Sequence, residues 1–259
     1  MTSTVFTATD ITSWVGTFMW ALFRVAALVT AAPILSSRTI PVKIKLGIAI
    51  AITLVIVPVL PPVPSVEPFS GEVLLITIQQ ILIGLAMGLS LQLVFAMFVI
   101  GGQVIAYQMG LGFASMVDPQ SGTQVPVVSQ FYVIVITLLF FTMNGHLMLV
   151  QSLHDSFVSL PIGPNGISLD GIWSMIEWSS QMYVGAIKIA LPAIASILLI
   201  NFTFAVVTRS APQFNIFSIG FPVTMVMGFF IIMVTLFTVL PHFSQQLESV
   251  FGLITRMLS

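Results

Sequence analysis

The sequence predicts an all-α membrane protein with about six long apolar segments, arranged as helical hairpins with kinked helices. Of its 259 residues, 58% are hydrophobic and only 6% are charged, whereas a soluble domain carries roughly 25% charged residues. The apolar runs approach or exceed the about 20 residues that a helix needs to cross a bilayer core. They do not alternate between apolar and polar residues, as the strands of a membrane β-barrel would. We therefore expect the apolar surface to face lipid, other protein, or both.

The composition and the motifs exclude several classes of function. The net charge of −1 provides no basic surface for nucleic acid. The chain has no cysteine, which excludes disulfides, thiolate metal sites and a cysteine nucleophile. We find no G-x-S-x-G, H-E-x-x-H or P-loop motif, and His146 and His154 lack nearby third and fourth metal ligands. We expect no enzymatic activity, no metal and no cofactor.

The apolar runs can be placed along the chain and oriented by charge. The first run follows a segment with Asp10 and no Lys or Arg, and it is too long for a signal peptide, so we expect it to remain as a helix. The loop 36–45 contains three of the seven basic residues, which predicts that it lies in the cytoplasm and that both termini lie outside. The runs lie at roughly 11–35, 44–60, 73–100, 126–150, 181–207 and 215–241.

Prolines and polar residues predict where these helices begin, bend or end. Pro126 lies near the start of its run, where a missing N–H group costs little. Asp170 can cap a short amphipathic stretch that carries three aromatic residues. Pro192 lies in the middle of its run and predicts a kink. Pro241 marks the expected end of the last run, with His242 at the boundary.

Small and amide residues indicate that the helices pack against protein. Gly84 and Gly88 form a small-xxx-small pair, and Gly101 and Gly102 follow in the same run. Such residues allow two helices to approach closely. The same run contains several glutamines, whose amide groups need partners when buried. These are Gln79, Gln80, Gln92 and Gln103.

Two basic residues, Arg24 and Lys188, lie inside apolar runs. Charged residues in the membrane are costly and are usually functional or paired. One interpretation is a proton or ion relay in a transporter, but no Asp or Glu lies deep in any run to complete it. The alternative is a structural role, in which each cation binds backbone carbonyl groups or a partner subunit. The residues alone leave both open and favour the second.

The segment 108–124, QMGLGFASMVDPQSGTQ, interrupts two apolar runs and yet remains partly apolar. Non-helical backbone at membrane depth persists only when it is buried in protein or lines a water-filled cavity. Methionine and phenylalanine provide a deformable apolar surface, and an apolar constriction can close a pore by excluding water. This pattern favours a loop that lines or plugs a pore over one that only packs.

Three stretches resemble the FliR family of flagellar and type III secretion export-gate proteins. They are RVAALVTAAPILSSRTIPVKIKLGIAIA at 24–51, QMGLGFASMVDPQ at 108–120, and TRSAPQFNIFSIGFP at 208–222. They occur in the same order as in the family, and the resemblance covers nearly the whole chain. Because three separate motifs agree, the identification is specific.

The resemblance implies a non-enzymatic subunit of the flagellar export gate. Such a subunit would assemble with FliP and FliQ, contact FlhB, and form part of the channel for unfolded flagellar subunits across the inner membrane, at the flagellar basal body. Residues 1–180 would be FliP-like, with a plug loop at about 107–124, and residues 181–259 would form a FliQ-like hairpin. The alternative function is a stand-alone secondary transporter, whose halves often repeat; the two halves here do not match.

The resemblance also implies roles for individual residues. The plug would comprise Met109, Gly110, Leu111, Gly112, Phe113, Met116, Val117 and Asp118. Six residues are candidates for holding the assembly together: Arg24, Lys188, Arg209, Pro212, Gln213 and Asn215. The partners implied are sister membrane proteins, membrane lipid and transient unfolded substrates, without nucleic acid.

Overall fold

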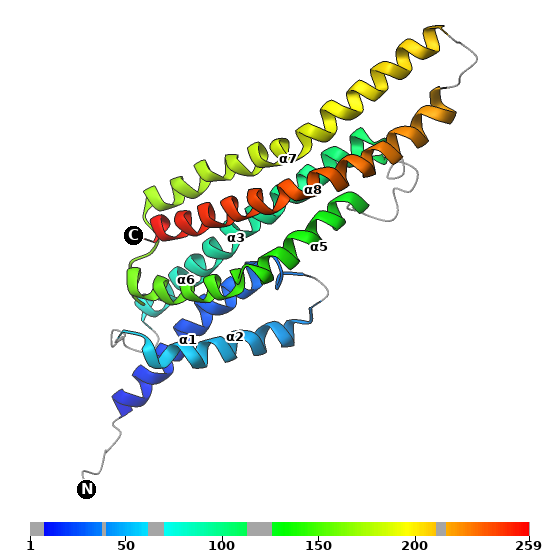
Figure 1. The fold of residues 1–259 in the computed structure, drawn as a ribbon. Helices are drawn as coiled ribbons and strands as arrows, with labels where there is room; N and C mark the ends of the chain where they lie inside the picture. Colours follow the sequence, from blue (N-terminus) through cyan, green and yellow to red (C-terminus); the bar gives the residue numbers. More distant parts are fainter. Residues whose placement is uncertain (1–7, 38–39, 62–69, 113–125, 211–215, 259) are drawn as a thin grey trace. The chain divides into compact units, whose positions relative to one another are not determined.

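The structure, a computed structural model, describes residues 8–37, 40–61, 70–112, 126–210 and 216–258. Every regular element within these ranges is a helix, which confirms the predicted all-α class (Figure 1). The elements are α1 (Ala8–Ala31), α2 (Val42–Ile56), the 3₁₀ helix η1 (Val57–Val59), α3 (Gly71–Gln108), α5 (Val127–Thr142), α6 (Gly145–Ser159), α7 (Leu169–Ser210) and α8 (Ile216–Met257).

Most of these helices are long and apolar enough to cross a membrane. The described residues contain five such helices, or six if the bent pair α5 and α6 counts as one span. Pro126 lies immediately before α5, as predicted. The multi-pass character expected from the apolar runs is thus confirmed.

The fourth run is broken, contrary to the prediction of one helix over 126–150. Helices α5 and α6 meet at an angle of 66°. Asn144 lies between them with a φ of 58°, in the left-handed region that asparagine tolerates better than most residues. The Asn144-Gly145 dipeptide is a turn signal. It ends the helix here, although the apolar residues on both sides predict a continuous one.

Helices α7 and α8 extend beyond their predicted limits. Helix α7 begins at Leu169 and includes the aromatic stretch expected to be separate. Its first turn is capped by Ser168, whose Oγ accepts a hydrogen bond of 3.0 Å from the Gly171 N–H group, so the prediction that Asp170 is the cap was wrong. Helix α8 continues through Pro241, the predicted end of its run.

The chain forms two compact units, each built from separate stretches of sequence. Unit 1 comprises Met1–Leu93, Asn144–Ser179 and Leu247–Ser259, and unit 2 comprises Val94–Met143 and Ser180–Gln246. Helices α3, α7 and α8 contribute to both. The predicted division near residue 180 into parts resembling two sister proteins remains a prediction, because a division into compact units does not show which proteins each part is related to.

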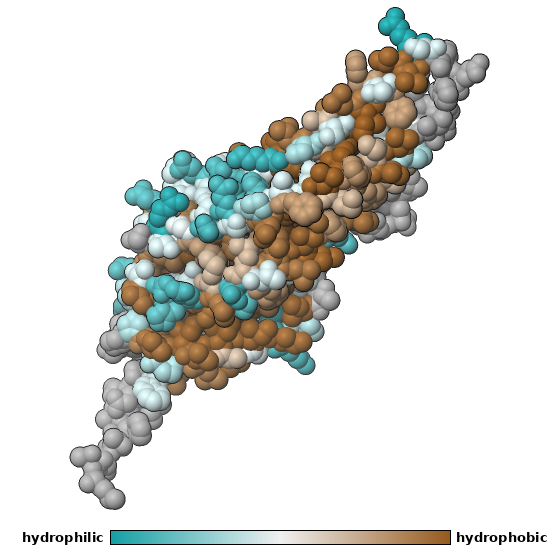
Figure 2. All heavy atoms as spheres, in the orientation of Figure 1, coloured by the Kyte–Doolittle hydropathy of each residue, from teal (hydrophilic) through white to brown (hydrophobic). Residues whose placement is uncertain are grey.

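The long helices differ in how much of their apolar surface is covered. In the most apolar stretch of α3, 56% of the residues are buried, compared with 17% in α7 and 22% in α8. Apolar residues dominate the visible face over α2 and over the later part of α7 (Figure 2). Ile187, Leu199 and Phe202 on α7 are 58–70% exposed. These surfaces need lipid or another protein to cover them.

Candidate functional site

In unit 1, α1 and α3 approach so closely that only glycine fits at two positions of α3. A Cβ atom on Gly84 would overlap the backbone oxygen of Arg24, and one on Gly88 would lie 2.5 Å from the Cβ of Ala31. The predicted small-xxx-small contact is therefore confirmed. Its effect is to hold the backbone of α1 directly against α3.

Arg24, on α1, is completely buried at this contact. Its Nε donates a hydrogen bond of 2.8 Å to Oε1 of Gln80 on α3. Its Nη1 donates to the backbone oxygen of Ser156 at 2.8 Å and to the Ser156 Oγ at 3.1 Å. Its Nη2 donates to the backbone oxygen of Leu160 at 2.8 Å. One guanidinium group thus joins α1, α3 and the end of α6.

The α6 contacts explain how a buried cation is tolerated. Ser156 and Leu160 lie at the C-terminal end of α6, where the helix dipole favours a positive charge. The Leu160 oxygen is among the last carbonyl groups, which have no partner within the helix, whereas the Ser156 oxygen also accepts a hydrogen bond from the Leu160 N–H group. The guanidinium carbon also lies 4.1 Å from the centre of the Phe157 ring, in the geometry of a cation–π interaction. Arg24 therefore caps α6 from a neighbouring helix.

This environment favours the structural interpretation of Arg24 over an ion relay. Its partners are backbone oxygens, a hydroxyl and an amide, and no carboxylate forms an ion pair with it in the part of the chain that the structure describes. Gln80 is also fully buried, and its Nε2 has no hydrogen-bond partner within the described ranges. The prediction that the glutamines of this run are buried in protein is confirmed for Gln80, but it was wrong for Gln92, which is exposed; Gln79 and Gln103 are partly buried.

In unit 2, α3 ends abruptly at the start of the predicted plug loop. The Gly110 N–H group donates to the Tyr107 oxygen, and the Leu111 N–H group donates to the Ala106 oxygen, both at 3.0 Å. Gly110 has a φ of +82°. This pair of hydrogen bonds around a left-handed glycine is the Schellman motif, which terminates helices. Gly110 is thus a helix-stop residue as well as a member of the predicted loop.

The residues at this helix end are held against α8. Met109 is fully buried, and its side chain occupies the space that a Cβ on Gly228 would need. The Phe221 ring lies against Gly110. Leu111 and Gly112 are partly exposed. The remaining predicted plug residues lie outside the described residues: Phe113, Met116, Val117 and Asp118.

The other predicted assembly residues are dispersed. Lys188 is exposed on α7, near a small pocket described below. Arg209 is exposed in the last turn of α7, where a cation complements the helix dipole. Arg24 belongs to unit 1, whereas Lys188 and Arg209 belong to unit 2. Pro212, Gln213 and Asn215 lie outside the described residues.

A glycine contact and a cluster of aromatic rings hold the helices of unit 2 together. The sequence predicted the glycine contact but not the aromatic cluster. A Cβ on Gly102 of α3 would lie 2.7 Å from the Cα of Ser129 on α5, so these helices touch through backbone. The rings of Phe95 and Phe98 pack edge-on against Phe243 of α8, with centroid distances of 6.1 and 5.7 Å. Phe243 is buried because α8 continues past Pro241, and a prediction that ended the helix there could not find this cluster.

Comparison with known proteins places the chain in a family. A family model described as "Bacterial export proteins, family 1" matches residues 15–250. Flagellar biosynthetic protein FliR of Escherichia coli (strain K12) is 38% identical over 95% of this chain and 94% of its own length. The protein of the same name from Pectobacterium carotovorum subsp. carotovorum is 37% identical over 98% of this chain and 97% of its own length. The protein of the same name from Bacillus subtilis (strain 168) is 26% identical over 84% of this chain and 85% of its own length.

The helices and the comparisons agree. The apolar helices are those of a multi-pass membrane protein, and the relatives that cover nearly the full chain are flagellar biosynthetic proteins. The chain therefore belongs to the bacterial export proteins of family 1, with the FliR proteins, and is a membrane component of the flagellar export apparatus.

Proposed function

We propose that the chain is a non-enzymatic subunit of the flagellar type III secretion export gate, and that it forms part of the channel for unfolded flagellar subunits across the inner membrane. Its partners in this proposal are FliP and FliQ within the gate and FlhB beside it. The loop that begins at Met109 closes the channel when no substrate is present.

The observation that carries the proposal is the way α3 ends. An apolar helix of 38 residues stops at a Schellman motif, and the chain continues into a segment rich in glycine, methionine and phenylalanine. The Schellman motif takes the backbone out of the helix at Gly110, and non-helical backbone at membrane depth needs protein or a water-filled cavity around it. A channel built with sister subunits supplies both.

The exposed apolar faces support assembly with other membrane proteins. On α7, Leu191 and Phe202 are 57% and 70% exposed, and on α8 Phe237 is 86% exposed. Lipid could cover these side chains, but the glycine contacts show that this chain also builds close helix–helix interfaces. We expect FliP and FliQ to cover part of these faces.

Site-specific crosslinking tests the proposal, because introduced cysteines are the only thiols in this chain. We expect Phe113→Cys and Met116→Cys to crosslink to an export substrate that is stalled by a folded domain too large to pass. Met109→Cys should crosslink in the same state, because passage of a substrate must release Met109 from the α8 contact that buries it here.

The control is Val42→Cys, at the start of α2, where the side chain is 77% exposed. It should react with a soluble or lipid-phase thiol reagent whether or not substrate is stalled, and it should not crosslink to substrate. If all three loop positions fail to crosslink while the gate is assembled and the control is labelled, the channel assignment is wrong.

A further inference from the structure

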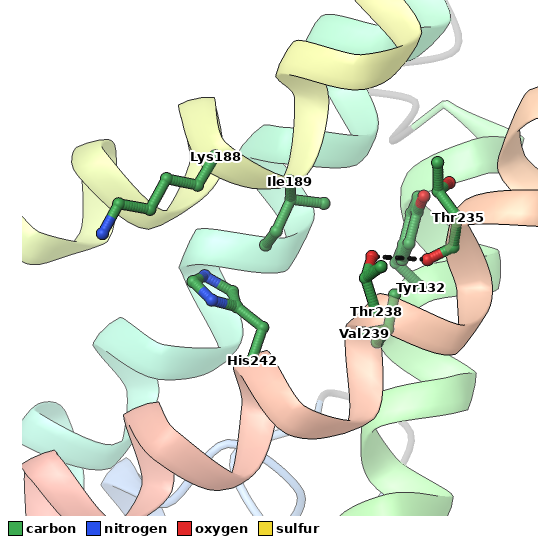
Figure 3. Close-up of a pocket in the computed structure, with 7 residues that line it drawn as sticks. All are labelled: Tyr132, Lys188, Ile189, Thr235, Thr238, Val239 and His242. Carbon is green, nitrogen blue, oxygen red and sulfur yellow. Dashed lines mark hydrogen bonds between the residues drawn. The ribbon is translucent and has the colours of Figure 1, made fainter.

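Unit 2 contains a small polar pocket within its otherwise apolar helices. The pocket has a volume of about 120 Å³ and lies among α5, α7 and α8 (Figure 3). Figure 3 shows the His242 imidazole between the α8 backbone and α7, with the Tyr132 hydroxyl beside Thr235. The lining residues are Tyr132, Lys188, Ile189, Thr235, Thr238, Val239 and His242.

The two threonines present acceptors to this pocket. Thr235 Oγ1 donates its hydrogen to the backbone oxygens of Ile231 and Ile232, at 2.9 and 3.2 Å. Thr238 Oγ1 donates to the Thr235 backbone oxygen at 2.7 Å. Each hydroxyl has a single hydrogen and two lone pairs. The Thr235 hydroxyl also makes a hydrogen bond with the Tyr132 hydroxyl. The lone pairs that remain on the two threonines can accept hydrogen bonds from a molecule in the pocket.

His242 provides an unsatisfied polar atom at the same place. Its Nε2 is buried and has no hydrogen-bond partner within the described ranges. The ring packs against Phe98 of α3, with a centroid distance of 6.3 Å, and it makes a hydrogen bond with the Gly185 backbone of α7, but neither contact satisfies Nε2. Buried polar atoms in native proteins nearly always have a partner, from protein or ordered water.

Water matches both the size and the chemistry of the pocket. A cavity needs about 10–15 Å³ of space for a water-sized probe to hold one water molecule, so the pocket has room for a small cluster. Water donates to the threonine oxygens and to Nε2, and it accepts from the Lys188 ammonium group. An inorganic anion would meet mainly acceptors at the two threonines, and a metal ion would lack carboxylate ligands, because none lines this pocket.

The titratable groups that line the pocket are Tyr132 from α5, Lys188 from α7 and His242 from α8, while α3 contributes the uncharged Phe98. Of these side-chain types, imidazole is the one whose charge ordinarily changes between about pH 5 and pH 8. His242 is therefore the group in this pocket that is suited to take up and release a proton.

We propose that this pocket is a hydrated proton-binding site, in which a small water cluster exchanges protons with Nε2 of His242. A hydronium ion in the cluster transfers a proton to the Nε2 lone pair and leaves water and an imidazolium with two N–H groups. The reverse transfer restores the neutral ring. Protonation adds a second cation near Lys188, with no carboxylate in the lining, so acid loosens the packing of α7 on α8 within unit 2.

This inference does not depend on the export role, and NMR tests it directly. The chain has three histidines, so the double variant His146→Gln, His154→Gln leaves His242 as the only imidazole. With histidine labelled in this chain alone, in the full chain within the export complex in lipid nanodiscs, we expect one ring whose charge changes with pH. We also expect Nε2 without a proton at high pH and exchange peaks between the ring and water. A ring that never changes charge, or that has no water contact, overturns the proposal.

Hydrogen exchange provides the structural readout. As the pH falls, the amides of residues 183–192 on α7 should exchange several-fold faster in the wild type, after correction for the intrinsic effect of pH. His242→Gln keeps a polar side chain but cannot gain charge, so it should show no such increase. Lys188→Gln should show a smaller increase than the wild type, because the repelling charge is gone. An equal increase in wild type and His242→Gln would contradict the proposed site.

Discussion

Replacing Arg24 with methionine is expected to destabilise unit 1 by about 2–4 kcal/mol. The substitution leaves the buried Oε1 of Gln80 and the part-buried backbone oxygen of Leu160 without the donor they have here, at roughly 1–3 kcal/mol for a fully buried unsatisfied group and less for a part-buried one. The Ser156 oxygen keeps the hydrogen bond from the Leu160 N–H group. Removing the buried charge of Arg24 offsets part of this loss. The expected destabilisation is therefore smaller than the sum of the two largest penalties.

Chemical unfolding of the purified protein in detergent would measure the Arg24 effect. Arg24→Lys should be intermediate, because an ammonium group keeps the charge but cannot reproduce the planar fork that reaches α3 and α6 together. Arg209→Met is the matched control, since Arg209 is an exposed arginine at a helix end. If Arg24→Met proves as stable as Arg209→Met, then Arg24 does not hold the three helices together.

The second large effect is expected from a single methyl group at Gly84. In Gly84→Ala the new Cβ overlaps the backbone oxygen of Arg24 and lies 2.8 Å from the Cβ of Ala27, neither of which is the end of a flexible side chain. Overpacking a core commonly costs about 1–3 kcal/mol, and a clash with backbone belongs at the upper end. We expect α1 to separate from α3 and the yield of assembled export complex to fall several-fold.

Gly47→Ala is the matched control for Gly84→Ala. Gly47 lies within α2, and a Cβ there would meet nothing within 4 Å. Alanine is favoured over glycine in a helix by up to about 1 kcal/mol, so this variant should be unchanged or slightly more stable. Equal stability and assembly of the two variants would mean that α1 and α3 do not approach through Gly84.

Features that depend on local pattern could be read from the sequence. The length and apolarity of the runs predicted the all-α, multi-pass class because a bilayer sets a minimum helix length. The spacing of Gly84 and Gly88 predicted a close helix contact because positions four apart lie on the same helix face. The segment 108–124 was predicted to interrupt two apolar runs, and Gly110 within it proved to be the left-handed residue that ends α3.

Features that depend on distant partners could not be read in this way. Arg24 bonds Ser156, which is 132 residues away in the sequence, and no local pattern indicates which carbonyl groups it caps. Pro241 suggested a helix end, but α8 continues through it. A proline removes only one N–H group from the helix, and neighbouring groups can satisfy the carbonyl that loses its partner.

The pocket residues could have been found with the right helix boundary. Thr235, Thr238, Val239 and His242 are spaced i, i+3, i+4 and i+7, which places them on one face of a helix. The sequence reading ended the helix at Pro241 and therefore treated His242 as a boundary residue. The bend at Asn144 was missed for a related reason, because the apolar residues on both sides outweighed one turn signal.

The central claim is that this chain forms part of an export channel and that the loop beginning at Met109 closes the channel. The most direct measurement is the ion conductance of the export complex reconstituted in a planar bilayer, with the wild type compared with a variant in which residues 109–117 are shortened. An intact assembly of unchanged size is the control for both. We expect the wild-type complex to be closed and the shortened variant to conduct small ions. Equal, low conductance of the two assembled complexes would contradict the claim.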